Sequence, residues 1–105
     1  MRLTQQERDA IAKAALATWH PGTRVSLFGS RVVDQARGGD IDLLVEAKAP
    51  LDAEELVRRR GDFVANLYGL IGERRIDVVV SSPGVSAPAF IVDAARSRAI
   101  ELLQT

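Results

Sequence analysis

The stretch LFGSRVVDQARGGDIDLLVE, residues 27 to 46, carries two aspartates inside an apolar run that is typical of a buried strand. Carboxylates are disfavoured in sheets and are rarely buried unless they are paired or bound to metal. Asp40 and Asp42 are two positions apart, so on a strand their side chains share one face, with Ile41 and Leu43 on the other. The stretch therefore predicts a strand that is apolar on one face and presents two carboxylates on the other.

A third carboxylate has the same setting further along the chain. Asp77 stands between Ile76 and Val78 in RRIDVVV, residues 74 to 80, which also has the composition of a strand. On a strand next to the first, Asp77 would face Asp40 and Asp42 across the sheet. Two carboxylates 4 Å apart repel by about 4 kcal/mol at an effective dielectric of 20, so three together favour a bound cation.

Oxygen ligands without His or Cys suit Mg²⁺ or Mn²⁺ rather than Zn²⁺. The acids thus predict a divalent-metal site, in which two ions share Asp40 and Asp42 and one is also held by Asp77. A structural reading stays open beside it. In that reading Asp40 caps the strand, Asp42 pairs with an arginine, and Asp77 lies on a solvent-facing edge.

Gly29 and Ser30 end the predicted strand at residues 24 to 28, just before a predicted short helix at residues 30 to 36. Backbone N–H groups at a helix start bind anions, and glycine lets a phosphate approach the backbone closely. By itself the pair also fits an ordinary strand-to-helix turn capped by serine. It is not a Walker loop, because no Gly-Lys-Ser/Thr follows.

Periodicity and capping signals predict helices that alternate with strands, and the aromatic residues Trp19 and Tyr68 on two of the helices are expected in the core. The tail at residues 99 to 105 is compatible with a helix extension or a short edge strand. This order predicts an α/β or α+β fold, a small mixed β-sheet packed with helices. The first two strands are about a dozen residues apart, near the lower limit for a parallel crossover, so they are parallel or antiparallel. The predicted elements are a helix from the Thr4–Glu7 capping box to Trp19, strands at 24–28, 40–46 and 74–80, a helix from the Asp52–Glu55 capping box to Ile71, and a helix from Pro88 to about Arg98.

Composition bounds the remaining possibilities. The 105 residues suit one domain, residues 1–105, which would bury about 65% of the surface that its unfolded chain exposes. Acidic and basic residues balance at 14 each, which argues against direct nucleic-acid binding. Without cysteine there are no disulfides or thiolate metal sites. The polar N-terminus lacks a signal peptide's apolar core and no long apolar run follows, so we expect a cytoplasmic protein with no membrane association.

The motifs taken together resemble the signature of the DNA polymerase β-like nucleotidyltransferase superfamily. They are FGS at residues 28 to 30, a spacer of nine residues, DIDL at residues 40 to 43, and IDV at residues 76 to 78. The chain is similar to the minimal nucleotidyltransferase (MNT) domain, which resembles the polymerase palm and is encoded beside HEPN-domain toxins. The spacer is one residue shorter than in many such domains, and Gly39 replaces a frequent serine.

The resemblance implies a site and an activity. It places phosphate binding on Gly29 and Ser30, and metal binding and catalysis on Asp40, Asp42 and Asp77, with two Mg²⁺ ions, or Mn²⁺, and ATP as substrate. It implies an antitoxin that transfers AMP to a tyrosine of a partner HEPN toxin. Three alternatives stay open: a catalytically weak module that neutralises its partner by binding, an enzyme that modifies a small-molecule hydroxyl, and a structural or interaction domain with no nucleotide role. Arg31 and Arg37, between the motifs, are either phosphate contacts or solvated surface.

Overall fold

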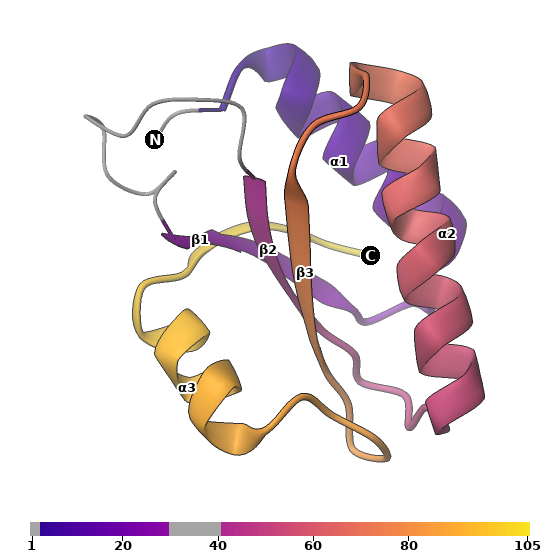
Figure 1. The fold of residues 1–105 in the computed structure, drawn as a ribbon, viewed down its shortest axis with the longest axis vertical. Coiled ribbons are helices and arrows are strands. Elements are labelled where there is room, and N and C mark those ends of the chain that lie inside the picture. Colours follow the sequence, from indigo (N-terminus) through magenta and orange to yellow (C-terminus); the bar gives the residue numbers. More distant parts are fainter. Residues whose placement is uncertain (1–2, 30–40) are drawn as a thin grey trace.

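The computed structural model describes residues 3–29 and 41–105, which form three helices and four strands (Figure 1). Every helix and strand that the sequence predicts in these ranges is confirmed, with shifts of a residue or two at the ends. The predicted short helix at residues 30 to 36 lies outside the described residues. The elements are α1 (Gln5–Thr18), β1 (Arg24–Phe28), β2 (Ile41–Glu46), α2 (Ala53–Ile71), β3 (Ile76–Ser81), α3 (Ala89–Ser97) and β4 (Ile100–Gln104).

The four strands form one mixed sheet in the order β3-β2-β1-β4. β1 is antiparallel to both β2 and β4, whereas β2 and β3 are parallel. This settles the two points that the sequence left open. The first two strands are antiparallel, and the tail is an edge strand that pairs with β1 rather than a continuation of α3.

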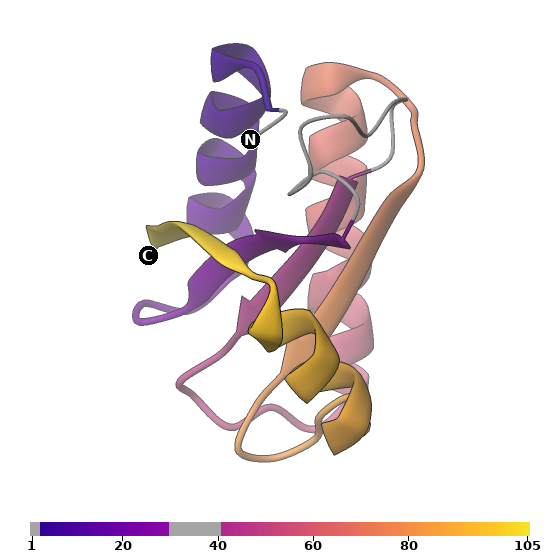
Figure 2. The same cartoon turned by 90° about the vertical axis from the view of Figure 1, so that its left-hand side faces the viewer.

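The helices cover the two faces of the sheet unequally. α1 and α2 lie side by side on one face, and the short α3 lies on the other (Figures 1 and 2). The larger apolar cluster joins the first pair of helices to alternate residues of the strands, among them Ile41, Leu43 and Val45. Leu44, which points the opposite way, is buried with Val92 and Ala95 of α3. β2 therefore has apolar contacts on both faces.

Local signals fix where the helices begin. Thr4 and Glu7 form the predicted capping box at the start of α1, with the backbone N–H of Glu7 donating to Thr4 Oγ1 at 3.0 Å. Asp52 caps α2 and accepts from the backbone N–H of Glu55 at 2.7 Å. Pro88 precedes α3. In the part of the chain that the structure describes, no helix is both long and apolar enough to cross a membrane.

The two aromatic residues expected in the core, Trp19 and Tyr68, differ in how far they are buried. Trp19 is 4% exposed and packs edge-to-face on Phe63, with ring centroids 5.6 Å apart. The prediction for Tyr68 is wrong, because its side chain is 37% exposed. Leu67 occupies the inward face of α2, and successive helical residues are turned by about 100°, so Tyr68 points away from the sheet.

Gly61 offers a simple test of α2. It lies inside the helix, is exposed, and a Cβ added there would meet no atom within 4 Å. Glycine inside a helix is unfavourable relative to alanine, so Gly61→Ala should raise the free energy of unfolding by about 0.5–1 kcal/mol in urea titrations. A decrease would mean that α2 does not run through this position as a regular helix.

Candidate functional site

Three side chains stand in one row across the end of the sheet. Phe28 of β1 is paired with Asp42 of β2, and Asp42 is paired in turn with Asp77 of β3. Neighbouring strands are about 4.8 Å apart and directly paired residues point to the same face. The structure therefore brings Asp42 and Asp77 together on one face, as the sequence predicts.

This face is the one that carries α3, and among the described elements α3 packs over the middle of the strands rather than over the end with the carboxylates. Along β2, Leu44 is fully buried beneath α3, whereas Asp42, two residues earlier, is only half-buried. Along β3, Val79 packs against the α3 cluster, and the Asp77 side chain is 51% exposed. The period of two along each strand explains this, since positions 42 and 44, and 77 and 79, share a face.

Gly29 ends β1 directly beside Asp42. Its φ of +76° lies in the left-handed region that favours glycine. A Cβ at this position would lie 3.0 Å from Cγ of Asp42 and closer still to its Oδ2. The backbone at Gly29 thus touches the carboxylate, which is the arrangement needed if phosphate and metal ligands are to be neighbours.

Arg75 is a partner of Asp77 that the sequence analysis did not identify. Its Nε lies 3.6 Å from Asp77 Oδ2, and both side chains are more than half exposed. A signal was present, because positions 75 and 77 share one side of the extended chain. β3 is also an edge strand of the sheet. The structural reading, in which Asp77 lies on a solvent-facing edge, is therefore confirmed for the position of this residue. An exposed ion pair of this kind contributes at most about 1 kcal/mol.

The described donors fit a hard divalent cation. Asp42 and Asp77 offer carboxylate oxygens from neighbouring strands, and an oxygen-only set suits Mg²⁺ or Mn²⁺. Within residues 3–29 and 41–105 there is no group of three or more His, Cys, Asp or Glu placed so that it could hold a metal ion. The predicted third metal ligand, Asp40, and the predicted phosphate ligand, Ser30, lie outside the described residues, as do Arg31 and Arg37. Their roles stay predictions.

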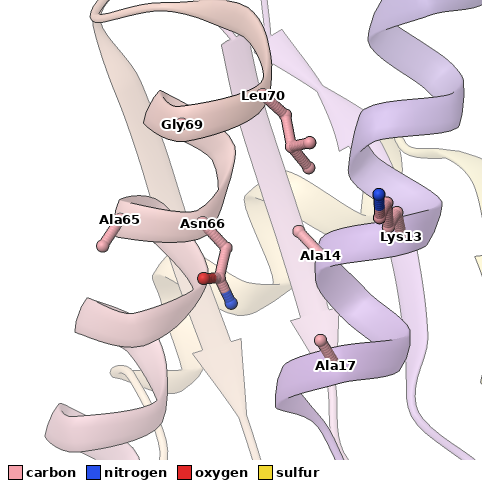
Figure 3. Close-up of a pocket in the computed structure, with 7 residues that line it drawn as sticks. All are labelled: Lys13, Ala14, Ala17, Ala65, Asn66, Gly69 and Leu70. Carbon is pink, nitrogen blue, oxygen red and sulfur yellow. The ribbon is translucent and has the colours of Figure 1, made fainter.

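A groove of about 300 Å³ lies between α1 and α2 (Figure 3). Small residues line it, including Ala14, Ala17 and Gly69, and Asn66 points into it from α2. The Asn66 amide donates to Thr18 Oγ1 at 3.1 Å, which links the two helices. These helices cover the face opposite to Asp42 and Asp77, so the groove is separate from the carboxylate site.

Compared with protein-family models and with curated proteins, the sequence matches none. The structure, however, is similar to solved structures of toxin-antitoxin pairs. One is a toxin-antitoxin with AMP-PNP, with a TM-score of 0.66 and 23% identity over 93% of this chain and 73% of that chain. Another is a tri-AMPylated Shewanella oneidensis HEPN toxin in complex with MNT antitoxin, with a TM-score of 0.66 and 21% identity over 98% of this chain and 74% of that one.

A mutant of the MntA-HpeT toxin-antitoxin has the same TM-score of 0.66, with 21% identity. All three of these neighbours are solved structures of toxin-antitoxin pairs. At these identities the similarity shows the fold. The chain shares the fold of these structures, and its own mixed sheet packed with helices is the α+β architecture that the sequence predicts.

The contact between Gly29 and Asp42 can be separated from simple backbone strain. Gly72 also has a positive φ, +84°, but a Cβ there would meet nothing within 4 Å. Gly29→Ala should therefore lower the free energy of unfolding more than Gly72→Ala, which carries only the strain of about 1–3 kcal/mol. Equal losses in urea titrations would show that the carboxylate of Asp42 does not lie against position 29.

Proposed function

We propose that this chain is a nucleotidyltransferase that moves AMP from ATP to a hydroxyl of a partner protein, a HEPN-type toxin, and thereby acts as its antitoxin. The observation that carries the proposal is the pair Asp42 and Asp77, in register on neighbouring strands and beside the left-handed Gly29. A carboxylate pair next to a backbone turn suits a metal-bound triphosphate.

The structural neighbours support the choice of donor and partner. One neighbour is a toxin-antitoxin with the ATP analogue AMP-PNP, and another is a complex of an MNT antitoxin with an AMPylated HEPN toxin. This chain shares their fold over most of its length. Of the residues that the motifs single out, Gly29, Asp42 and Asp77 lie in the described part of the chain, and all three lie at the same end of the sheet.

Each residue has a role in the proposal. Asp42, Asp77 and, from the sequence, Asp40 hold the divalent ions, two Mg²⁺ or Mn²⁺. A metal ion held there would supply the positive charge that a triphosphate and a leaving pyrophosphate require. The backbone at Gly29, followed by Ser30, holds the β- and γ-phosphates close to Asp42.

The reaction then requires mainly positioning. The acceptor oxygen attacks the α-phosphorus, the bond from that phosphorus to the bridging oxygen breaks, and pyrophosphate leaves. Asp77 is the more exposed of the two described carboxylates and lies on the open edge strand, where an acceptor can approach. We assign to Asp77 the role of the base that accepts the proton of the attacking hydroxyl. Arg75 positions this carboxylate through its ion pair.

The test is transfer of label from α-³²P-ATP to the neighbouring-gene protein in the presence of Mg²⁺. We expect labelled acceptor with the wild type, and loss of at least about a hundredfold in rate for Asp42→Asn, because mutations of single charge-stabilising groups cost about 10²–10³. EDTA should also stop the transfer. Glu54→Gln, an exposed acid at the start of α2, is the matched control and should leave the rate unchanged.

Other outcomes would point to the alternatives. Neutralisation of the toxin that survives Asp42→Asn, without any labelled acceptor, would contradict the enzyme and support a module that acts by binding. Label found only on added small-molecule alcohols would support nucleotidyltransferase activity and contradict the proposal that the acceptor is a protein.

A further inference from the structure

A pocket of about 340 Å³ lies between the end of β1 and the outer side of α3. Phe28 and Gly29 line it from the strand, and Phe90, Ile91, Ala94 and Arg98 line it from the helix and the residue after it. Its walls are therefore almost entirely apolar. Among the described residues that line the pocket, the Arg98 side chain is the one with hydrogen-bond donors.

The pocket is continuous with the carboxylate site. Gly29 lines the pocket and also lies against the carboxylate of Asp42. Phe28, which lines it too, is the direct strand partner of Asp42. In a nucleotide whose β- and γ-phosphates lie at Gly29, the α-phosphate and the ribose separate these phosphates from the base, and the pocket begins at the same residue.

Packing among residues 3–29 and 41–105 does not account for the aromatic wall. Phe90 is 74% exposed, the largest exposed fraction among the large apolar residues of the described chain, and Ile91 is 38% exposed. α3 is anchored instead by Val92 and Ala95, which are buried against Leu44. An exposed aromatic residue beside a ligand site indicates a contact with the ligand or a partner.

The chemistry of the walls suits a flat aromatic ring. Base–aromatic stacking is tolerant of sequence because every base has a π-face, and a nearby arginine adds a cation–π or hydrogen-bond contact. The structure describes no ion-pair partner for Arg98 among residues 3–29 and 41–105, and this side chain is exposed at the rim. It is therefore available to a ring nitrogen or a phosphate.

We propose that this pocket is the nucleobase subsite, in which Phe90 stacks on the base of the bound nucleoside triphosphate and Arg98 contacts the edge of the base. The proposal rests on the proposed nucleotidyltransferase function and adds the site for the base. Recognition by stacking predicts weak discrimination among purines, so GTP should bind nearly as well as ATP.

The experiment compares two ligands by calorimetry on the full chain with Mg²⁺: ATP, and tripolyphosphate, which has the phosphates without the base. Phe90→Ala should lower the affinity for ATP about tenfold and leave the affinity for tripolyphosphate unchanged, because Phe90 stacks on the base and not on the phosphates. Phe90→Trp should retain ATP affinity. Ala94→Phe, which fills the pocket from an exposed position, should also weaken ATP alone.

Leu16→Ala is the matched control, since Leu16 is an apolar residue 66% exposed on α1, on the other face of the sheet. It should change neither affinity. An equal loss of affinity for both ligands in Phe90→Ala, or no loss of affinity for ATP, would contradict the proposed nucleobase subsite. Neither result would contradict the proposed nucleotidyltransferase function. If Phe90→Ala kept ATP but lost its protein partner, Phe90 would belong to a docking surface instead. A wild type that binds neither ligand would overturn the proposed function itself.

Discussion

The structure depends most on the pairing of β2 with its two neighbours. β2 is antiparallel to β1 and parallel to β3, and this register alone puts Phe28, Asp42 and Asp77 in one row. A shift of one residue would turn Asp42 into the core between the sheet and α1 and α2, where a carboxylate without a partner is strongly unfavourable. The burial of Ile41 and Leu43 against those helices therefore also fixes where the acids point.

Much of this could be predicted from the sequence, because it depends on local periodicity. The faces of Ile41 and Asp42 follow from alternation along a strand, and the start of α1 follows from the Thr4–Glu7 spacing. Strand order could not be predicted, since it depends on contacts between distant segments. The pairing of β4 with β1, which makes the tail an edge strand, is one example.

The position of α3 on the same face as Asp42 and Asp77 could not be predicted from the sequence either, for the same reason. The sequence predicts α3 but not the face that it covers, so neither its contact with Leu44 nor the pocket beside Gly29 could be foreseen. Within the described residues, α3 covers the middle of the face at Leu44 and not the end with the carboxylates. One short helix thus limits the site on one side and, in our proposal, holds the base through Phe90.

The central claim is that Asp42 and Asp77 hold one metal ion between them. The most direct measurement is a crystal structure with Mn²⁺ and AMP-PNP, with anomalous scattering used to locate the metal. We predict a peak within bonding distance of carboxylate oxygens of both Asp42 and Asp77, near the roughly 2.1 Å of Mg²⁺–oxygen bonds. A nucleotide bound with no metal peak at these two residues, or with the metal held elsewhere, would contradict the account.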